Sequence, residues 1–247
     1  CSRTILRFPD GGCYVTGNRC DRGAVVTEEA APTKKTEEVP DLFRLRQELL
    51  FKTYPVSPVR GEQSETIGLP RVLEFWDSMP FWSTFFRALG YPVKFSRPSS
   101  RKQYESGLQY VASDTICFPA KLVHGHVLDL SKQGVDRIFL PYILHMPPEN
   151  KREKSPYVCP VIMGYSMVVR NFQSPEEHFS VDFETPVFHW FTEKDRKRQI
   201  CQYAMDRCGA TKQQAEEACR QAAAAITAFR HQLAEAGKQV IADTEKT

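Results

Sequence analysis

The chain lacks the glycine-rich loops that commonly hold phosphate groups. Neither G-x-x-x-x-G-K-[ST] nor G-x-G-x-x-G occurs among its 13 glycines, so nucleotide binding by these two modes is not expected of this domain. The G-x-S-x-G elbow of serine hydrolases and the H-E-x-x-H motif of zinc peptidases are missing too. Any chemistry must therefore come from residues outside these common signatures.

Long apolar runs and a strong charge bias are also missing. No apolar stretch approaches the roughly 18 residues that a membrane helix needs, and the first residues do not form a signal peptide. The net charge of +3 is too small to indicate a nucleic-acid ligand. We therefore expect neither a membrane nor a nucleic-acid partner. Because the chain begins with Cys-Ser-Arg instead of Met, we expect it to be a piece of a longer polypeptide.

Eight cysteines are present, at positions 1, 13, 20, 117, 159, 201, 208 and 219. They do not form a compact disulfide framework, and a chain that is 41% hydrophobic can build a core without one. We expect reduced thiols in a cytoplasmic protein, with metal ligands among them. Cys201, Cys208 and Cys219 are spaced close to whole helical turns, which favours a packing seam over a metal site.

The composition divides the chain into four segments. Residues 1–23 alternate like a short cysteine-containing hairpin around a Pro-Asp-Gly-Gly turn. Residues 24–65 form a linker and then a short amphipathic helix with Asp41 as its N-cap. Residues 66–191 form an α/β lobe, and residues 192–247 form a helical closing segment.

Strand and helix patterns alternate within the lobe. Strands are predicted within residues 66–76, 91–95, 137–144 and 158–163, and helices at 79–89, from 101, and from 117 to about 134. Residues 171–191 are aromatic and irregular. The closing helices span residues 193–208 and the segment from a Thr211–Gln214 capping box to about 242. This order predicts an α/β fold, an open, mostly parallel doubly wound sheet with an N-terminal hairpin appendage and two closing C-terminal helices.

Ligands of such a sheet gather beyond the carboxyl ends of its strands. The loops expected at this rim are residues 76–80, 96–100 and 142–146, together with the Cys159-Pro160 region. The aromatic residues between 75 and 86 are more typical of a core than of a cofactor site.

Cys117 is the most informative residue of the lobe. It stands just before an apolar helix that has a proline in its first turn, where backbone N–H groups and the helix dipole favour a thiolate. Cys159, followed by Pro160, has a similar setting. Thiolates bind metals and iron–sulfur clusters, but a small buried core residue is the ordinary role of a free cysteine.

Four segments together carry a resemblance to a known family. They are GLPRVL at 68–73, PFWSTFF at 80–86, SDTICFPAKLVHGH at 113–126 and the Cys-Pro pair at 159–160. They resemble the uncharacterised C-terminal domain of CoA-substrate-specific enzyme activase (acyl-CoA dehydratase activase-related) proteins. This domain is related to 2-hydroxyacyl-CoA dehydratase subunits and to double-cubane-cluster proteins. Cys1 and Cys20 resemble the end of a four-cysteine segment that precedes the domain in this family.

The resemblance implies an iron–sulfur cluster that passes low-potential electrons, with Cys117 and Cys159 at ligand positions and Cys1 and Cys20 as weaker candidates. It implies ATPase domains and a second lobe as parts of the parent chain, and a dehydratase or reductase as a partner. The dehydratase subunits carry a further cysteine soon after the first strand, where this chain has Trp76-Asp-Ser-Met-Pro80. We therefore expect the parent to be an ATP-dependent activase or reductase, and this chain alone to hold no cluster and to be inactive.

Three nearby residues could assist such a site. His124 could donate to a cluster sulfur or a substrate carbonyl, Lys121 could lower the pKa of Cys117 or meet an anionic CoA phosphate, and Ser113 opens the same motif. His124 also has an ordinary structural interpretation as a helix-surface or core imidazole, and Lys121 as a solvated lysine. A non-catalytic scaffold or docking domain, with no metal of its own, is the alternative function.

Overall fold

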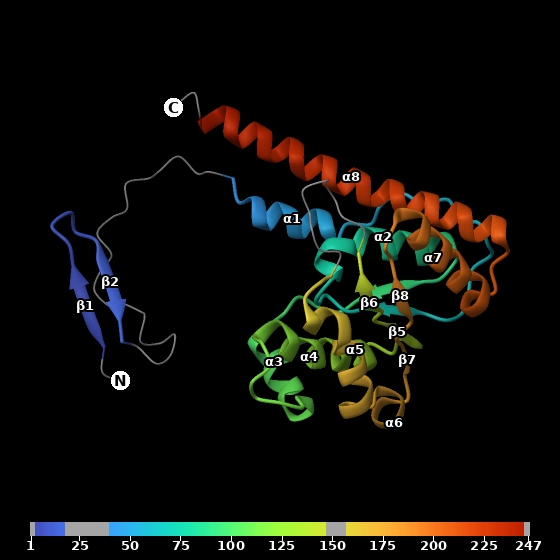
Figure 1. Ribbon diagram of the computed structural model, residues 1–247, viewed down its shortest axis with the longest axis horizontal. Helices are drawn as coiled ribbons and strands as arrows, with labels where there is room; N and C mark the ends of the chain where they lie inside the picture. Colours follow the sequence, from blue (N-terminus) through green and yellow to red (C-terminus); the bar gives the residue numbers. More distant parts are fainter. Residues whose placement is uncertain (1–2, 18–39, 147–156, 245–247) are drawn as a thin grey trace. The chain divides into compact units, whose positions relative to one another are not determined.

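The computed structural model describes residues 3–17, 40–146 and 157–244 and divides the chain into two compact units, Cys1–Pro40 and Asp41–Thr247 (Figure 1). The first unit contains the predicted hairpin, in which β1 (Thr4–Arg7) pairs antiparallel with β2 (Cys13–Thr16). Its turn needs glycine, because Gly11 has a φ of 86°. Cys1 and Cys20 lie outside the described residues.

The second unit is the α/β lobe. Its elements, in chain order, are α1 (Leu42–Leu50), β3 (Ile67–Leu69), α2 (Phe75–Ala88), β4 (Val93–Phe95), α3 (Arg101–Gly107), the 3-10 helix η2 (Leu108–Tyr110), α4 (Phe118–Lys132), β5 (Arg137–Phe139), β6 (Tyr142–His145), α5 (Pro160–Phe172), α6 (Pro175–Phe179), β7 (Asp182–Glu184), β8 (Val187–His189), α7 (Glu193–Cys208) and α8 (Lys212–Thr244).

A parallel sheet with the strand order β4-β3-β5-β7 forms the centre of this lobe. β3 pairs in parallel with both β4 and β5, and β7 pairs in parallel with β5. All residues of β3 and β5 are buried, as expected for strands covered on both faces. The predicted open, parallel α/β sheet is confirmed.

The chain runs from β3 through α2 to β4 on one side and then crosses back to β5 on the other side. β3 and β5 therefore flank the point where the winding direction reverses, and ligands of doubly wound folds bind at the carboxyl ends of such strands.

Two prolines split strands that would otherwise be continuous. We predicted one strand over residues 137–144, but the structure has β5 and β6, with Pro141 between them. Pro186 separates β7 from β8 in the same way. β6 pairs in parallel with β8 as a separate small sheet. The reason is that proline has no N–H to donate and interrupts the ladder.

The predicted strand at residues 158–163 is wrong, because this segment begins helix α5. Pro160 occupies the first turn, where its fixed φ suits a helix. Tyr165, Ser166 and Val169 are then buried at helical spacing. The expectation of irregular structure over 171–191 is also wrong, since α6, β7 and β8 lie there. Strands of three residues are too short to show a period in the sequence.

Helices cover both faces of the sheet. Figure 1 shows α2, α7 and α8 on one side and α3, α4, α5 and α6 on the other, and the helices of each group contact one another. The two predicted closing helices are α7 and α8, with the Thr211–Gln214 capping box in place. Within the described ranges, no helix combines the length and the apolar character needed to cross a membrane.

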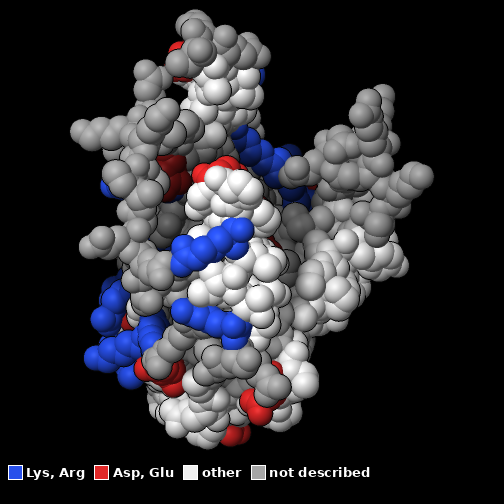
Figure 2. All heavy atoms as spheres, turned by 90° about the vertical axis from the view of Figure 1, so that its left-hand side faces the viewer, with Lys and Arg blue, Asp and Glu red and all other residues white. Residues whose placement is uncertain are grey.

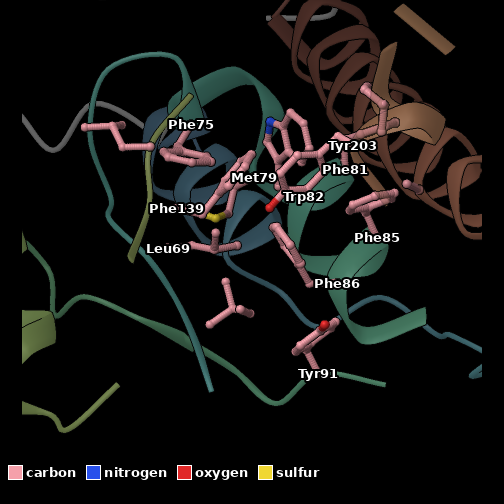
Figure 3. Close-up of a cluster of buried hydrophobic side chains, with 14 of the residues drawn as sticks. Leu69, Phe75, Met79, Phe81, Trp82, Phe85, Phe86, Tyr91, Phe139 and Tyr203 are labelled. Carbon is pink, nitrogen blue, oxygen red and sulfur yellow. The ribbon is translucent and has the colours of Figure 1, made fainter. Parts of the chain in front are cut away.

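Helix α2 carries the centre of the core, and this confirms the role predicted for its aromatic residues. Trp82, Phe85 and Phe86 are fully buried, and their rings gather with Phe139 of β5 (Figure 3). The Trp82 and Phe139 ring centroids are 4.7 Å apart. Aromatic pairs of this kind each add about 1 kcal/mol beyond area burial.

The helix begins at Phe75, earlier than predicted, so Pro80 lies inside it. Pro80 cannot bond the carbonyl of Trp76 four residues earlier. Arg46 of α1 supplies the missing donor, with its Nη2 atom 2.5 Å from this carbonyl oxygen. A basic side chain on α1 therefore permits a proline within α2.

Glycines allow α3 and α4 to cross at close range. A Cβ atom on Gly107 would lie 2.4 Å from the backbone nitrogen of Gly125, and one on Gly125 would lie 2.3 Å from the carbonyl oxygen of Gln103. Real Cβ atoms do not approach so closely, so both positions need glycine. This contact fixes the position of α4, the helix that follows Cys117.

Candidate functional site

Cys117 and Cys159 occupy equivalent positions on two neighbouring helices. Cys117 is the N-cap of α4 and Cys159 is the N-cap of α5, and each helix has a proline in its first turn. Both thiols are free and exposed, and neither makes a side-chain capping bond. Each thiol is therefore exposed at the positive end of a helix.

A buried polar contact joins the two helices. His124 of α4 is fully buried, with Nε2 2.9 Å from the hydroxyl of Tyr165 on α5 and Nδ1 2.9 Å from Oε1 of Gln173. The Gln173 amide nitrogen donates to the His124 carbonyl at 3.0 Å. Its Oε1 must therefore accept from Nδ1–H, which leaves Nε2 to accept from Tyr165.

This bonding gives His124 a structural role in the described lobe. Both of its ring nitrogens are occupied, and burial lowers its pKa, opposed by the bond to Gln173. A neutral imidazole bridges the two helices without bringing a charge into the core. The role of a donor to a cluster or substrate, which we considered for His124, would require these bonds to break.

The contact lies at a similar distance from each cysteine. His124 is seven residues beyond Cys117 and Tyr165 is six beyond Cys159, about 10 Å along each helix axis at ~1.5 Å per residue. Burial raises the pKa of Tyr165 to about 12, and negative charge on Cys117 contributes to this increase. A charge on Cys117 therefore acts on a residue of α5, the helix that follows Cys159.

The loop before Cys117 is held by its own polar groups. The Lys121 ammonium group donates to the Asp114 carbonyl at 2.7 Å, and the Ser113 and Thr115 hydroxyls are 2.9 Å apart. Lys121 therefore places a positive charge one helical turn from Cys117 while it closes the loop. Ser113 bonds within the loop.

The other described cysteines lie on different elements. Cys13 is exposed on β2 of the first unit. Cys201, Cys208 and Cys219 are buried on α7 and α8, as predicted for a packing seam.

The fit of an iron–sulfur cluster to these residues is partial. In the described part of the chain, no group of three or more Cys, His, Asp or Glu side chains is arranged to hold a metal ion. A small cluster normally takes four protein thiolates, so Cys117 and Cys159 could supply at most half of such a set.

The rim loops only partly match their prediction. Residues 96–100 are a loop after β4, as expected, but residues 76–80 lie within α2 and residues 142–145 form β6. Ser96 is fully buried in this rim. Its hydroxyl accepts from the Arg71 backbone N–H at 2.8 Å and lies 2.7 Å from Nδ1 of His126. Burial lowers the pKa of His126 to about 4.

Sequence reasoning missed Glu74, which follows β3 at the winding reversal. Its side chain is 7% exposed, Oε2 accepts from the Ser78 hydroxyl at 2.5 Å, and Oε1 has no hydrogen-bond partner among the described residues. Burial raises its pKa to about 7. The preceding residue, Leu73, has a φ of 49°, a strained value for a side chain of this size. A glutamate after a strand gives no sequence signal of burial, so only the structure identifies it.

Charges on the surface are mixed. Figure 2 shows one face, on which basic and acidic side chains lie among larger uncharged areas. Several are paired, as are Arg44 and Glu48 of α1 at 3.0 Å.

Comparison with known proteins adds one positive finding. Searches of curated proteins and of solved structures found no match. The family model described as the CoA enzyme activase uncharacterised domain matches residues 66–247, which is the α/β lobe from β3 onward. The chain therefore belongs to the CoA enzyme activase uncharacterised domain family.

Proposed function

We propose that this domain contributes Cys117 and Cys159 as thiolate ligands to an iron–sulfur cluster that another polypeptide segment completes. The observation that carries the proposal is the matched setting of the two cysteines. Both are exposed N-caps, and they begin two helices that a buried histidine contact joins.

The electrostatics of both positions favour ligation. Metals bind the thiolate and not the thiol. Each thiol stands at the positive end of a helix dipole, where negative charge is generally favoured. For Cys117, the ammonium group of Lys121 adds a positive charge one turn away. Neither thiol is used in a side-chain capping bond, so both are available to bind a metal.

This domain would supply only some of the ligands of the cluster. A site with two exposed thiolates and no third ligand among the described residues is open to solvent, so the missing ligands must come from a partner segment. A bound cluster would supply one-electron transfer at low potential. The chain itself would hold two thiolates in a fixed orientation, because α4 and α5 are locked by His124, Tyr165 and Gln173.

Anaerobic reconstitution of the native polypeptide that carries this domain tests the proposal. The protein is incubated with ferrous iron and sulfide, its iron is counted and its reduced EPR spectrum is recorded. We expect Cys117→Ser and Cys159→Ser each to lose iron and EPR signal, and Cys13→Ser, an exposed cysteine of the other unit, to keep both. Unchanged iron in both test variants contradicts the proposal.

A scaffold role is the second candidate, and the absence of a three-ligand group in the described residues favours it. In this case the domain presents its surface to a partner and binds no metal. The same two variants would then keep the iron content of the native polypeptide and its assembly with partners.

A further inference from the structure

Helices α7 and α8 bring two thiols into contact at their shared seam. The sulfur atoms of Cys201 and Cys219 are 3.5 Å apart. The two residues are 7% and 6% exposed, and the seam around them is built from small side chains that include Ala204, Ala215 and Ala222. The two sulfurs are in contact, whereas a disulfide bond would bring them to ~2.05 Å.

The surroundings make the two thiols unequal. The hydrogen bond between the two sulfurs and the positive charge of Lys197, one turn earlier on α7, lower the pKa of Cys201. The same bond, together with burial, raises the pKa of Cys219. The pair therefore favours a thiolate on Cys201 and a proton on Cys219, which is the arrangement of an attacking and a resolving thiol.

A surface hollow is lined by Lys197 and Glu216, which stand one helical turn before Cys201 and Cys219 respectively. It has a volume of about 640 Å³ and is lined by residues of α7, α8 and the segments next to them, among them Lys197, Thr211, Gln214, Glu216 and Arg220. Lys197 and Glu216 line this hollow and also act electrostatically on Cys201. The hollow is polar and carries both signs of charge, which suits a small zwitterionic molecule.

Cys208 offers an internal comparison on the same helix. It is also buried, but no sulfur contact to it is present among the described residues. Burial raises its pKa to about 11, so it has the character of an inert core thiol.

We propose that Cys201 and Cys219 are a redox modification site that a small-molecule disulfide of the glutathione class oxidises to an intramolecular disulfide. The Cys201 thiolate attacks one sulfur of the oxidant, whose S–S bond breaks and releases one thiolate. Cys219 then loses its proton, attacks the Cys201 sulfur of the mixed disulfide and releases the second thiolate. The two protein thiols are oxidised and the oxidant is reduced to two thiols. These take up the proton that Cys219 releases and the proton that Cys201 gave to solvent when it ionised.

The bond would tie α7 to α8 across the turn between them. It would close a loop between residues 18 positions apart and so reduce the conformational freedom of the unfolded chain. A disulfide that closes a loop of this size raises the melting temperature of a chain this long by roughly 5–10 °C. Because α8 also contacts α1 and α2, oxidation would stabilise the whole covering layer on this side of the sheet.

Peptide mapping after controlled oxidation tests the proposal. The reduced full chain is incubated anaerobically with excess oxidised glutathione, then alkylated and digested with trypsin without reduction. We expect a disulfide-linked pair of peptides, residues 199–207 with residues 213–220. Cys208 falls on a separate peptide, and any adduct or disulfide of the exposed cysteines involves other peptides, so neither obscures the result.

Single variants assign the two roles. Alanine fits this small-residue seam, so Cys219→Ala should fold and accumulate a stable glutathione adduct on Cys201. Cys201→Ala should form neither the link nor an adduct on Cys219 at a comparable rate. Cys208→Ala should keep the linked pair, and the melting temperature of the wild-type chain should rise on oxidation. Absence of the linked peptides from the oxidised wild type, or an equally fast adduct on Cys219 in Cys201→Ala, overturns the proposal.

Discussion

Replacement of Glu74 by glutamine should stabilise the domain at alkaline pH and have much less effect at acidic pH. Burial raises the pKa of this carboxyl from 4.5 to about 7, so the folded state holds a proton that the unfolded state releases from pH 4.5 upward. Stability from this group is fully present below pH 4.5 and is lost as the pH rises toward and through 7. Glutamine stays neutral and can still accept from the Ser78 hydroxyl.

The magnitude follows from the two pKa values. Because the side chain is only 7% exposed, solvent screening is weak, and the cost of the wild-type carboxyl is about 3 kcal/mol at pH 8 and less than about 1 kcal/mol at pH 5. The stability gain from Glu74→Gln should therefore be about 2–3 kcal/mol larger at pH 8 than at pH 5.

Urea unfolding of both proteins at the two pH values measures this difference. Glu48→Gln, the same substitution on the exposed surface of α1, serves as the control, and its effect should vary by less than about 0.5 kcal/mol with pH. A gain from Glu74→Gln that is equal at pH 5 and pH 8 would refute the reasoning, because the carboxyl would then be ionised in the folded state at both.

Three further predictions concern stability and are read out by urea unfolding at neutral pH. Trp82→Ala should cost about 3–5 kcal/mol, because it removes the largest ring of the core, and a loss below about 1 kcal/mol would contradict this packing. Gly125→Ala should cost more than about 1 kcal/mol, since its Cβ would meet the Gln103 carbonyl at 2.3 Å. Gly61→Ala is the control, because nothing lies within 4 Å of the added atom, and it should change stability by less than about 0.5 kcal/mol. Equal effects of Gly125→Ala and Gly61→Ala would contradict the close crossing of α3 and α4. Tyr165→Phe should cost about 1–3 kcal/mol, because it leaves Nε2 of buried His124 without a donor, whereas no loss would argue against the bond between α4 and α5.

Local signals in the sequence predicted much of this fold. Asp41 and the Thr211–Gln214 box cap their helices as expected, because a capping bond depends on residues three positions apart. The sequence also predicted the strand β3 and the core position of the aromatic residues of α2. These features depend on composition and period within a few residues.

Longer-range effects limited the rest. The apolar residues after Val158 fit a strand as well as a helix, and only packing against α4 and β6 selects the helix. Similarly, residue type and helix position identified Cys117 and Cys159, but the bond from His124 to Tyr165 joins residues 41 positions apart. No local pattern encodes that contact or the burial of Glu74.

The central claim is that Cys117 and Cys159 face one site, and thiol cross-linking tests it most directly. Two thiolates on one small cluster lie within roughly 7 Å of each other. Dibromobimane, which fluoresces when it bridges two thiols, is added to the reduced chain, and its tryptic peptides are identified by mass spectrometry. We expect a fluorescent bridge between the peptides that carry Cys117 and Cys159, and either serine substitution should abolish it. Single alkylation of each cysteine, with no bridge between them, would contradict it.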